Sequence, residues 1–249
     1  MLRNLLAAGA VVVAGLAATG AQAQDVLSRG DVETIVREYL LANPEVLEEA
    51  FTALQTRRQE AEEEARTASL VAYRDALEAS PHDAVIGNPE GDVTLVEFFD
   101  YNCGFCRRAM DDLNTLMEED PNLRVVLKEF PVLGQQSMEA AAVSISVNQL
   151  HPEAYGEFHE RLMRVHGQAD GDVALSIAEE MELPRAALEE NMRSDDVRDV
   201  VQQGYEVAQA LGLSGTPSYV VGDAVEFGAV GYEQLKVRIN QARCGEAVC

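Results

Sequence analysis

The sequence is poor in cysteine and in basic residues, and it has only one long apolar run. Four cysteines among 249 residues are too few to staple a chain of this size, so stability must come from an apolar core and a cysteine pair is left free for chemistry. Lys and Arg number 19 against 43 Asp and Glu, a formal net charge of −24. This balance argues against nucleic acid and against an anionic membrane surface as partners, since both need clustered basic residues. The simplest interpretation of the acidity is that it keeps the protein soluble.

The apolar run lies at the N-terminus. Leu5 to Ala18 follows Arg3 and precedes Ala21-Gln22-Ala23, the order of a secretory signal peptide with a small-x-small cleavage site. The run is too short for a confident membrane span, and no other segment approaches ~20 apolar residues. We therefore predict a signal peptide over residues 1–23, cleaved near Ala23, and an exported chain in a compartment that permits disulfides. A membrane anchor is the alternative.

Residues 24–82 have the pattern of a helical arm. Asp31 can cap a first helix, and Asn43-Pro44 ends it and starts a second. The apolar positions follow helical spacing; they are Val32, Ile35, Val36, Tyr39 and Leu40, then Leu47, Ala50, Phe51 and Leu54. Gln55 to Thr67 has no large apolar side chain and indicates an exposed spacer, after which Leu70, Tyr73 and Leu77 can dock on the next domain. Two short amphipathic helices make no core alone, so we predict an oligomerisation arm and linker; an arm packed on the main domain is the alternative.

Residues 83–249 have the pattern of one α/β domain. Val93 to Phe99 is a predicted central strand, Cys103 to about Glu118 a helix, and Leu123 to Phe130 a second strand, which favours parallel pairing with a right-handed crossover. A helical pattern runs from Ser137 to about Leu211. A short hairpin then pairs Ser218–Val221 with Ala224–Phe227, and a last helix carries Tyr232, Leu235 and Ile239. This order predicts a thioredoxin-like fold with a helical insertion.

Cys103-Gly104-Phe105-Cys106 stands between the predicted central strand and its helix. A thiol at a helix N-terminus lies beside unpaired backbone N–H groups and the positive end of the helix dipole, which stabilise a thiolate. We therefore expect Cys103 to be the nucleophile of thiol–disulfide exchange. Cys106 is the expected resolving thiol, which attacks the mixed disulfide and releases the substrate. Arg107 and Arg108 either add positive charge to the site or are solvated.

A metal is the alternative occupant of this cysteine pair. Zinc needs four ligands, and the chain has neither a second Cys-x-x-Cys nor a His-x3–5-His pair. Haem attachment needs a histidine where Arg107 stands. Copper(I) suits two thiolates, so Cys103 and Cys106 remain a candidate copper(I) site, and we expect no other cofactor.

Two further positions complete the candidate site. Pro217, in Gly215-Thr216-Pro217, precedes a predicted strand, and beside a strand–CxxC–helix unit we expect it to be a cis-proline that faces the dithiol, with Thr216 near the active sulfur. Glu97 lies among apolar neighbours on the central strand, where a carboxylate is costly to bury. It is either a proton acceptor with a raised pKa for Cys106 or the partner of Lys128 in a structural ion pair.

Cys244 and Cys249 form the other cysteine pair, five residues apart. A local disulfide is the simplest interpretation for an exported chain, and a second redox pair or a metal clip is the alternative. The histidines show no ligand spacing and are expected to have no role in the mechanism; they are His82, His151, His159 and His166.

Three segments resemble the DsbA-like thioredoxin-fold proteins over about residues 83–243. They are Phe98 to Cys106, Lys128 to Gly134 and Gly215 to Pro217. Tyr39 to Leu47 is similar to the N-terminal region of the ScsC, or suppressor of copper sensitivity, proteins. The resemblance implies a periplasmic thiol–disulfide oxidoreductase, and members with this arm can trimerise, act as isomerases and serve copper tolerance. It also implies the roles of nucleophile, resolving thiol, cis-proline and buried acid for Cys103, Cys106, Pro217 and Glu97.

The residues between the cysteines bear on the direction of the reaction. DsbA oxidases have Pro-His there, whereas Gly104-Phe105 is closer to the Gly-Tyr of the isomerase DsbC, and Thr216 before Pro217 agrees with it. We therefore predict a disulfide isomerase that acts on exported proteins with mispaired disulfides. A membrane-bound reducing partner and a homo-oligomer, a trimer by resemblance, are implied. A DsbA-like dithiol oxidase and a copper(I)-binding protein are the alternatives.

Overall fold

A computed structural model describes residues 27–249, so the predicted signal peptide over residues 1–23 lies outside the described residues. The chain divides into two compact units, with the boundary between Arg57 and Arg58. The boundary falls inside helix α2, Glu45–Ala72. Among the described residues, no helix combines the length and apolar character that a membrane span requires.

The first unit contains helix α1, Arg29–Ala42, and the beginning of α2. Ser28 is the N-cap of α1, and Asp31 accepts a hydrogen bond from the Ser28 backbone N–H at 2.9 Å, which makes a capping box. The prediction that Asp31 itself caps the helix is therefore wrong: the cap lies three residues earlier. Asn43 ends α1, and Pro44 separates it from α2 as predicted.

Helix α2 continues without a break through the segment predicted as a spacer, residues 55–67. In α1 no residue is buried, and in α2 only Leu70 is buried. The spacer is thus an exposed helix, the stiff form of such a segment.

In the second unit, five strands form one sheet in the order β1-β3-β2-β4-β5. The strands are β1 Ala84–Gly87, β2 Val93–Phe99, β3 Leu123–Glu129, β4 Ser218–Val221 and β5 Ala224–Phe227. β2 and β3 are parallel, with Val93 opposite Leu123, and helix α4, Gly104–Glu119, connects them. β4 runs antiparallel to β2 and forms a hairpin with β5. The sequence analysis did not predict β1, which pairs antiparallel with β3 at the edge of the sheet.

Each face of the sheet is covered by helices from different parts of the chain. Leu95, Phe99 and Tyr219 belong to a core shared with α4, with the helical insertion and with α10, Tyr232–Cys244. Val96 and Phe98 belong to a second core with α9, Asp195–Ala210, and with α3, Arg74–Glu78. Leu70 and Leu77 are buried in this second core, and Tyr73 packs against it, so the predicted apolar stripe docks on the sheet.

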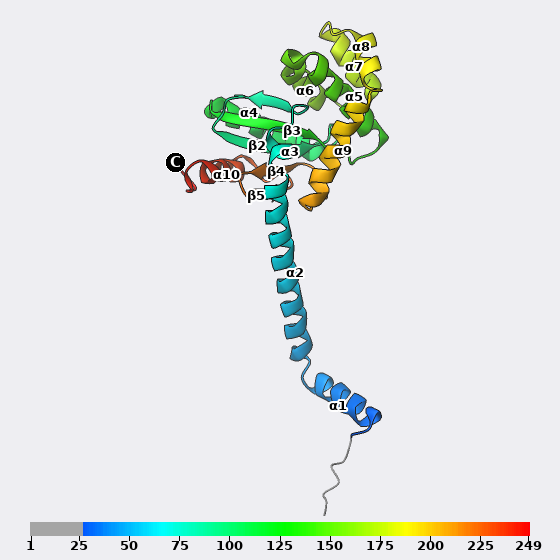
Figure 1. The fold of residues 1–249 in the computed structure, drawn as a ribbon, viewed down its shortest axis with the longest axis vertical. Coiled ribbons are helices and arrows are strands. Elements are labelled where there is room, and N and C mark those ends of the chain that lie inside the picture. Colours follow the sequence, from blue (N-terminus) through cyan, green and yellow to red (C-terminus); the bar gives the residue numbers. More distant parts are fainter. Residues whose placement is uncertain (1–26) are drawn as a thin grey trace, which may run out of the picture. The chain divides into compact units, whose positions relative to one another are not determined.

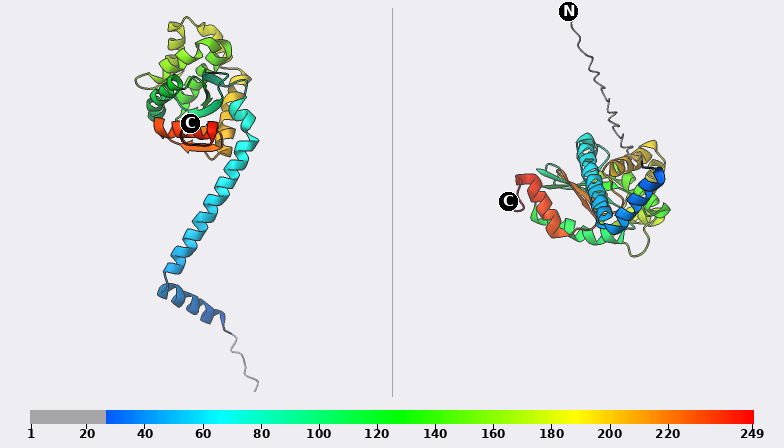
Figure 2. Two further views of the ribbon diagram at one scale, coloured as in Figure 1. Left: turned by 90° about the vertical axis from the view of Figure 1, so that its left-hand side faces the viewer. Right: turned by 90° about the horizontal axis from the view of Figure 1, so that it is seen from below.

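The helical insertion lies between β3 and β4 (Figure 2). Its elements are α5 Gln135–Leu150, the 3-10 helix Pro152–Ala154, α6 Tyr155–Met163, α7 Gly171–Glu180, α8 Arg185–Asn191 and α9. Figures 1 and 2 show α5 to α8 gathered together beside the sheet. This arrangement is the thioredoxin-like fold with a helical insertion that the sequence predicts.

Lys128 forms a buried ion pair with Asp83 and also donates to the Ala76 carbonyl. The alternative pairing of Lys128 with Glu97 is wrong. Glu97 lies opposite Leu127 in the parallel register, and Lys128 lies opposite Phe98. Because side chains alternate between the faces of a sheet, Lys128 and Glu97 point in opposite directions.

We expect Lys128→Met to lower the free energy of unfolding by about 3–5 kcal/mol, because it leaves Asp83 as a buried charge without a partner. Lys236→Met is the matched control, since Lys236 pairs with Glu119 at 2.8 Å while both side chains stay about half exposed; it should cost less than ~1 kcal/mol. Urea unfolding of the two variants measures both values. Equal losses would contradict the assignment of the buried pair.

Candidate active site

Cys103 is the N-cap residue of α4, directly after the loop that leaves β2. Its Sγ accepts a hydrogen bond from the Cys106 backbone N–H at 3.4 Å. Cys103 and Cys106 are both free thiols and both buried, with 6% and 1% of their surface exposed. The strand thus places one sulfur at the positive end of the helix and the second sulfur behind it.

The Thr216–Pro217 peptide bond is cis, and its loop meets the dithiol. β4 runs antiparallel to β2 with Ser218 opposite Phe98, so the loop before β4 lies beside the end of β2. Cys103 Sγ lies 3.1 Å from the Thr216 carbonyl oxygen, to which the sulfur donates when it is protonated. The structure therefore brings together Cys103, Cys106, Thr216 and Pro217, although the two pairs are more than a hundred residues apart in the sequence.

The two thiols differ strongly in acidity. A hydrogen bond from the Cys106 thiol lowers the pKa of Cys103 to about 5, with further contributions from the Thr216 side chain and from the backbone N–H groups of Cys106 and Phe105. Burial, together with the hydrogen bond to Cys103 and the nearby Glu97, raises the pKa of Cys106 well above its ordinary value. At neutral pH Cys103 is therefore a thiolate and Cys106 a thiol.

Glu97 is buried on β2, on the face of the sheet that carries α4. Burial raises the pKa of its carboxyl to about 8, and the negative charge of Cys103 adds to the increase. Its neighbour across the β2–β4 pair is Tyr219. The Tyr219 hydroxyl offsets part of this rise, although it makes no hydrogen bond of normal geometry to any described residue.

Asp100 organises the loop in front of the dithiol, and the sequence analysis assigned it no role. Its buried carboxylate accepts the Asn102 N–H at 2.8 Å, the Ser137 hydroxyl at 2.7 Å and the Leu133 N–H at 2.9 Å. Asn102 in turn exchanges two hydrogen bonds with the backbone of Ala169, both at 2.8 Å. An acidic residue directly after a buried strand was the one signal in the sequence.

Tyr101 and Arg107, which lie close to the cysteines in the sequence, connect this loop to the helical insertion by hydrogen bonds. The Tyr101 hydroxyl lies 2.7 Å from Ser144 Oγ and 3.0 Å from His159 Nδ1. The Arg107 guanidinium donates to the carbonyls of Tyr101, Val165 and Gly167, each at 2.9 Å. Arg107 is thus not simply solvated, one of the two roles that the sequence analysis considered, because its guanidinium joins the loop to the insertion.

Exposed apolar side chains flank the dithiol. Phe105, between the two cysteines, is 58% exposed and lies under the Arg108 guanidinium, 4.5 Å from its ring centroid. Val132 and Leu133 are exposed on the loop that Asp100 holds. An extended, partly apolar polypeptide can therefore lie against Cys103.

Comparison with known families agrees with this geometry. Residues 94–240 match the DSBA-like thioredoxin domain. The chain belongs to the DSBA-like thioredoxin family. Residues 29–61 match a second family, the copper resistance protein ScsC N-terminal domain. The protein is therefore a DsbA-like thiol–disulfide oxidoreductase with an ScsC-type N-terminal region.

Relatives cover both the family domain and the N-terminal region. A thioredoxin-like oxidoreductase from Silicibacter pomeroyi DSS-3 is 44% identical, covers 68% of this chain and 97% of its own, and superposes with a TM-score of 0.65. ScsC from Proteus mirabilis, in a transitional conformation, is 32% identical over 87% of this chain and 97% of its own, with a TM-score of 0.65. Disulfide bond formation protein D of Bacillus subtilis is 24% identical over 69% of this chain and 83% of its own length.

The reaction of this DSBA-like protein's Cys103 with iodoacetamide should have a pH midpoint near 5, far below the ~8.5 of a free cysteine. Only the thiolate reacts, so the rate falls as pH drops through the midpoint and is flat above it. Cys106→Ala removes the largest stabilising hydrogen bond and should raise the midpoint. A midpoint near that of a free cysteine in the unaltered protein would show that the helix terminus does not stabilise the thiolate.

Proposed function

We propose that the protein is a periplasmic disulfide isomerase that uses Cys103 and Cys106 on exported proteins with mispaired disulfides. The observation that carries the proposal is the pair of unequal thiols, a Cys103 thiolate at the N-terminus of α4 and a more deeply buried, protonated Cys106 behind it. The Cys103 thiolate attacks one sulfur of the substrate disulfide, a mixed disulfide forms, and the other substrate sulfur leaves. That substrate thiolate can then attack a different disulfide and correct the pairing.

Cys106 ends the cycle when rearrangement fails. It attacks Cys103 Sγ of the mixed disulfide, the substrate leaves as a thiolate, and a Cys103–Cys106 disulfide remains. Cys106 must first lose a proton, and we assign Glu97 as the acceptor. The Cys103 charge that helps to raise the pKa of Glu97 is absent in the mixed disulfide, so Glu97 ionises more readily when the acceptor is needed.

The predicted signal peptide over residues 1–23 supports a periplasmic location, and so does the disulfide between Cys244 and Cys249, since such bonds persist in oxidising compartments. We retain residues 24–82 as arm and linker and residues 83–249 as the catalytic domain. Because the resting isomerase needs a reduced Cys103, a membrane-bound reducing partner belongs to the proposal.

The arm supports a homo-oligomer, for which we favour a trimer. Its apolar side chains remain exposed in the single chain although they form helical stripes. They are Val32, Ile35, Val36, Tyr39, Leu47, Phe51 and Leu54, each 44–63% exposed. A second and a third copy of the same helices offer a complementary surface, and several catalytic domains on one hub could hold one misfolded substrate.

We expect Ile35→Glu combined with Phe51→Glu to make the protein monomeric and to lower the reactivation of a scrambled multi-disulfide protein by at least about tenfold, since joined sites gain by effective concentration. Reduction of a small disulfide should be unchanged. Thr34→Glu with Thr56→Glu adds the same charge on the polar side of the helices and serves as control. Mass in solution and recovered enzyme activity of the substrate are the measurements.

Three measurements separate the alternatives. Full isomerase activity in a monomeric variant would remove the oligomer from the proposal. A reduction potential near about −120 mV, with oxidation of reduced substrates and no reshuffling of their disulfides, would make the protein a DsbA-like oxidase instead.

Copper(I) binding at Cys103 and Cys106 is the second candidate, favoured by the match of residues 29–61 to a copper resistance domain. It predicts copper(I) uptake that needs both sulfurs, without turnover of disulfides.

We expect Glu97→Gln to slow the attack of Cys106 on a mixed disulfide by on the order of 10²-fold, because the proton acceptor is lost. Alkylation of Cys103 should stay fast. Release of a chromophoric thiol from a preformed mixed disulfide at Cys103 measures this step, and Glu97→Asp should restore part of the rate. An unchanged release rate would leave Glu97 with a structural role only.

A further inference from the structure

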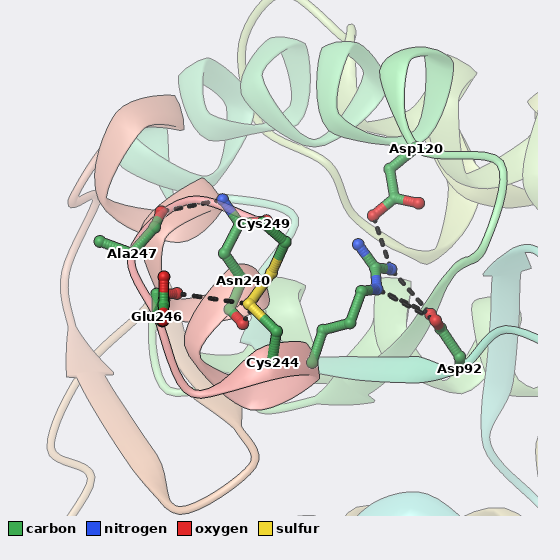
Figure 3. The surroundings of a disulfide bond; sticks show 8 residues. Asp92, Asp120, Asn240, Cys244, Glu246, Ala247 and Cys249 are labelled. Carbon is green, nitrogen blue, oxygen red and sulfur yellow. Dashed lines mark hydrogen bonds and ion pairs between the residues drawn. A yellow bond between two sulfur atoms is a disulfide. The ribbon is translucent and has the colours of Figure 1, made fainter.

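A second cysteine pair lies at the end of the sheet opposite to Cys103. Cys244, the last residue of α10, forms a disulfide with Cys249. The preceding residue, Arg243, forms ion pairs with Asp92 and Asp120 at 2.7 and 2.8 Å (Figure 3). Asp92 stands directly before β2, whereas Cys103 follows the other end of that strand. The two cysteine pairs are therefore separated by the length of the central strand.

This disulfide holds no part of the core together. It ties residues 245–249 to the last turn of α10, and all of these residues are exposed. The buried residues of α10, Leu235 and Ile239, precede Cys244 by nine and five residues. Opening the bond uncovers no buried apolar side chain, so the fold is compatible with both redox states. Both cysteines are exposed, and an exposed disulfide is the kind that a thiolate can attack.

The two pairs lie at helix ends of opposite polarity. Cys103 is at the N-terminus of α4, where N–H groups face its sulfur, whereas Cys244 is at the C-terminus of α10. Backbone carbonyl oxygens lie near both sulfurs of the second pair, Glu246 O at 4.0 Å from Cys244 Sγ and Asn240 O at 3.3 Å from Cys249 Sγ. Carbonyl oxygens and the negative helix end destabilise a thiolate. Cys103 also has a carbonyl oxygen beside it, that of Thr216 at 3.1 Å, but there the Cys106 N–H donates to the sulfur at the positive helix end. A pair whose reduced form is stabilised, such as Cys103–Cys106, takes electrons from one whose thiolates are destabilised.

We propose that Cys244 and Cys249 form a second redox site, which as a dithiol reduces the Cys103–Cys106 disulfide of another copy of this chain. One thiol of the pair loses its proton and attacks Cys103 Sγ as a thiolate, the Cys103–Cys106 bond breaks, and Cys106 leaves and takes up a proton. The other sulfur of the pair loses its proton and attacks the mixed disulfide, and Cys103 leaves as a thiolate. Two electrons pass between the chains and one proton goes to solvent. The products, an oxidised Cys244–Cys249 and a reduced Cys103–Cys106, are the two states in this structure.

The transfer has to pass between copies. Seven residues of β2 span about 23 Å at ~3.3 Å per residue. The five residues after Cys244 reach at most about 18 Å when fully extended, so the released tail does not reach its own Cys103. The step uses the exchange chemistry of the Cys103–Cys106 pair and so rests on the proposed function. A protein dithiol of the reducing partner then reduces the Cys244–Cys249 disulfide back to the dithiol.

The test mixes two full-length variants. The donor, Cys103→Ser with Cys106→Ser, is reduced and freed of reductant; the acceptor, Cys244→Ser with Cys249→Ser, is oxidised. After acid quenching, alkylation and mass measurement count the thiols on each chain. We expect the acceptor to be reduced and the donor oxidised, with the equilibrium at least tenfold on that side. A donor that also carries Cys249→Ser lacks the second sulfur and should accumulate a mixed disulfide between the chains.

Dithiothreitol supplies the control that separates the two proposals. An acceptor that dithiothreitol reduces but the donor does not, or an equilibrium that leaves the electrons on Cys244 and Cys249, overturns the second redox site while the exchange chemistry of Cys103 stands. An acceptor that resists dithiothreitol as well overturns the proposed function and this route with it.

Discussion

The stabilisation of one sulfur at the N-terminus of α4 is the interaction on which the rest of the site depends. Cys103 is acidic because backbone N–H groups and the Cys106 thiol point at it, and this geometry exists only if β2 ends where α4 begins. The antiparallel pairing of β4 with β2 then brings the Thr216–Pro217 loop to the same sulfur. The acidity of Cys103 therefore depends both on the polarity of α4 and on the order of the strands in the sheet.

Local patterns in the sequence predicted the elements that carry this constraint. β2, β4 and β5 have the predicted bounds, and β3 ends one residue earlier, because apolar runs between turn residues define central strands well. β1 was missed because its four residues, Ala84–Gly87, are a strand only through pairing with β3. The first helix cap was misplaced because Ser28 and Asp31 are both good caps, and only the hydrogen bonds show which is the N-cap.

The parts of the site that the sequence could not predict involve partners distant in the chain. Asp100 binds groups 33 and 37 residues away, and Lys128 pairs with Asp83 across 45 residues. The register of β2 and β3 decided between Glu97 and Asp83 as the partner of Lys128, since alternate residues face opposite sides. Such pairings depend on tertiary contacts, which local patterns in the sequence do not predict.

The unequal acidity of the two thiols bears on whether bonds are made or reshuffled. A low pKa makes Cys103 a good leaving group as well as a thiolate at neutral pH, so it both enters and leaves mixed disulfides readily. A raised pKa leaves Cys106 mostly protonated, which delays its attack on the mixed disulfide. During that delay the thiol freed in the substrate can attack elsewhere in the same molecule. In the proposed isomerase, the burial that protonates Cys106 favours rearrangement of the substrate over immediate release, and the proposed proton acceptor Glu97 sets how long the delay lasts.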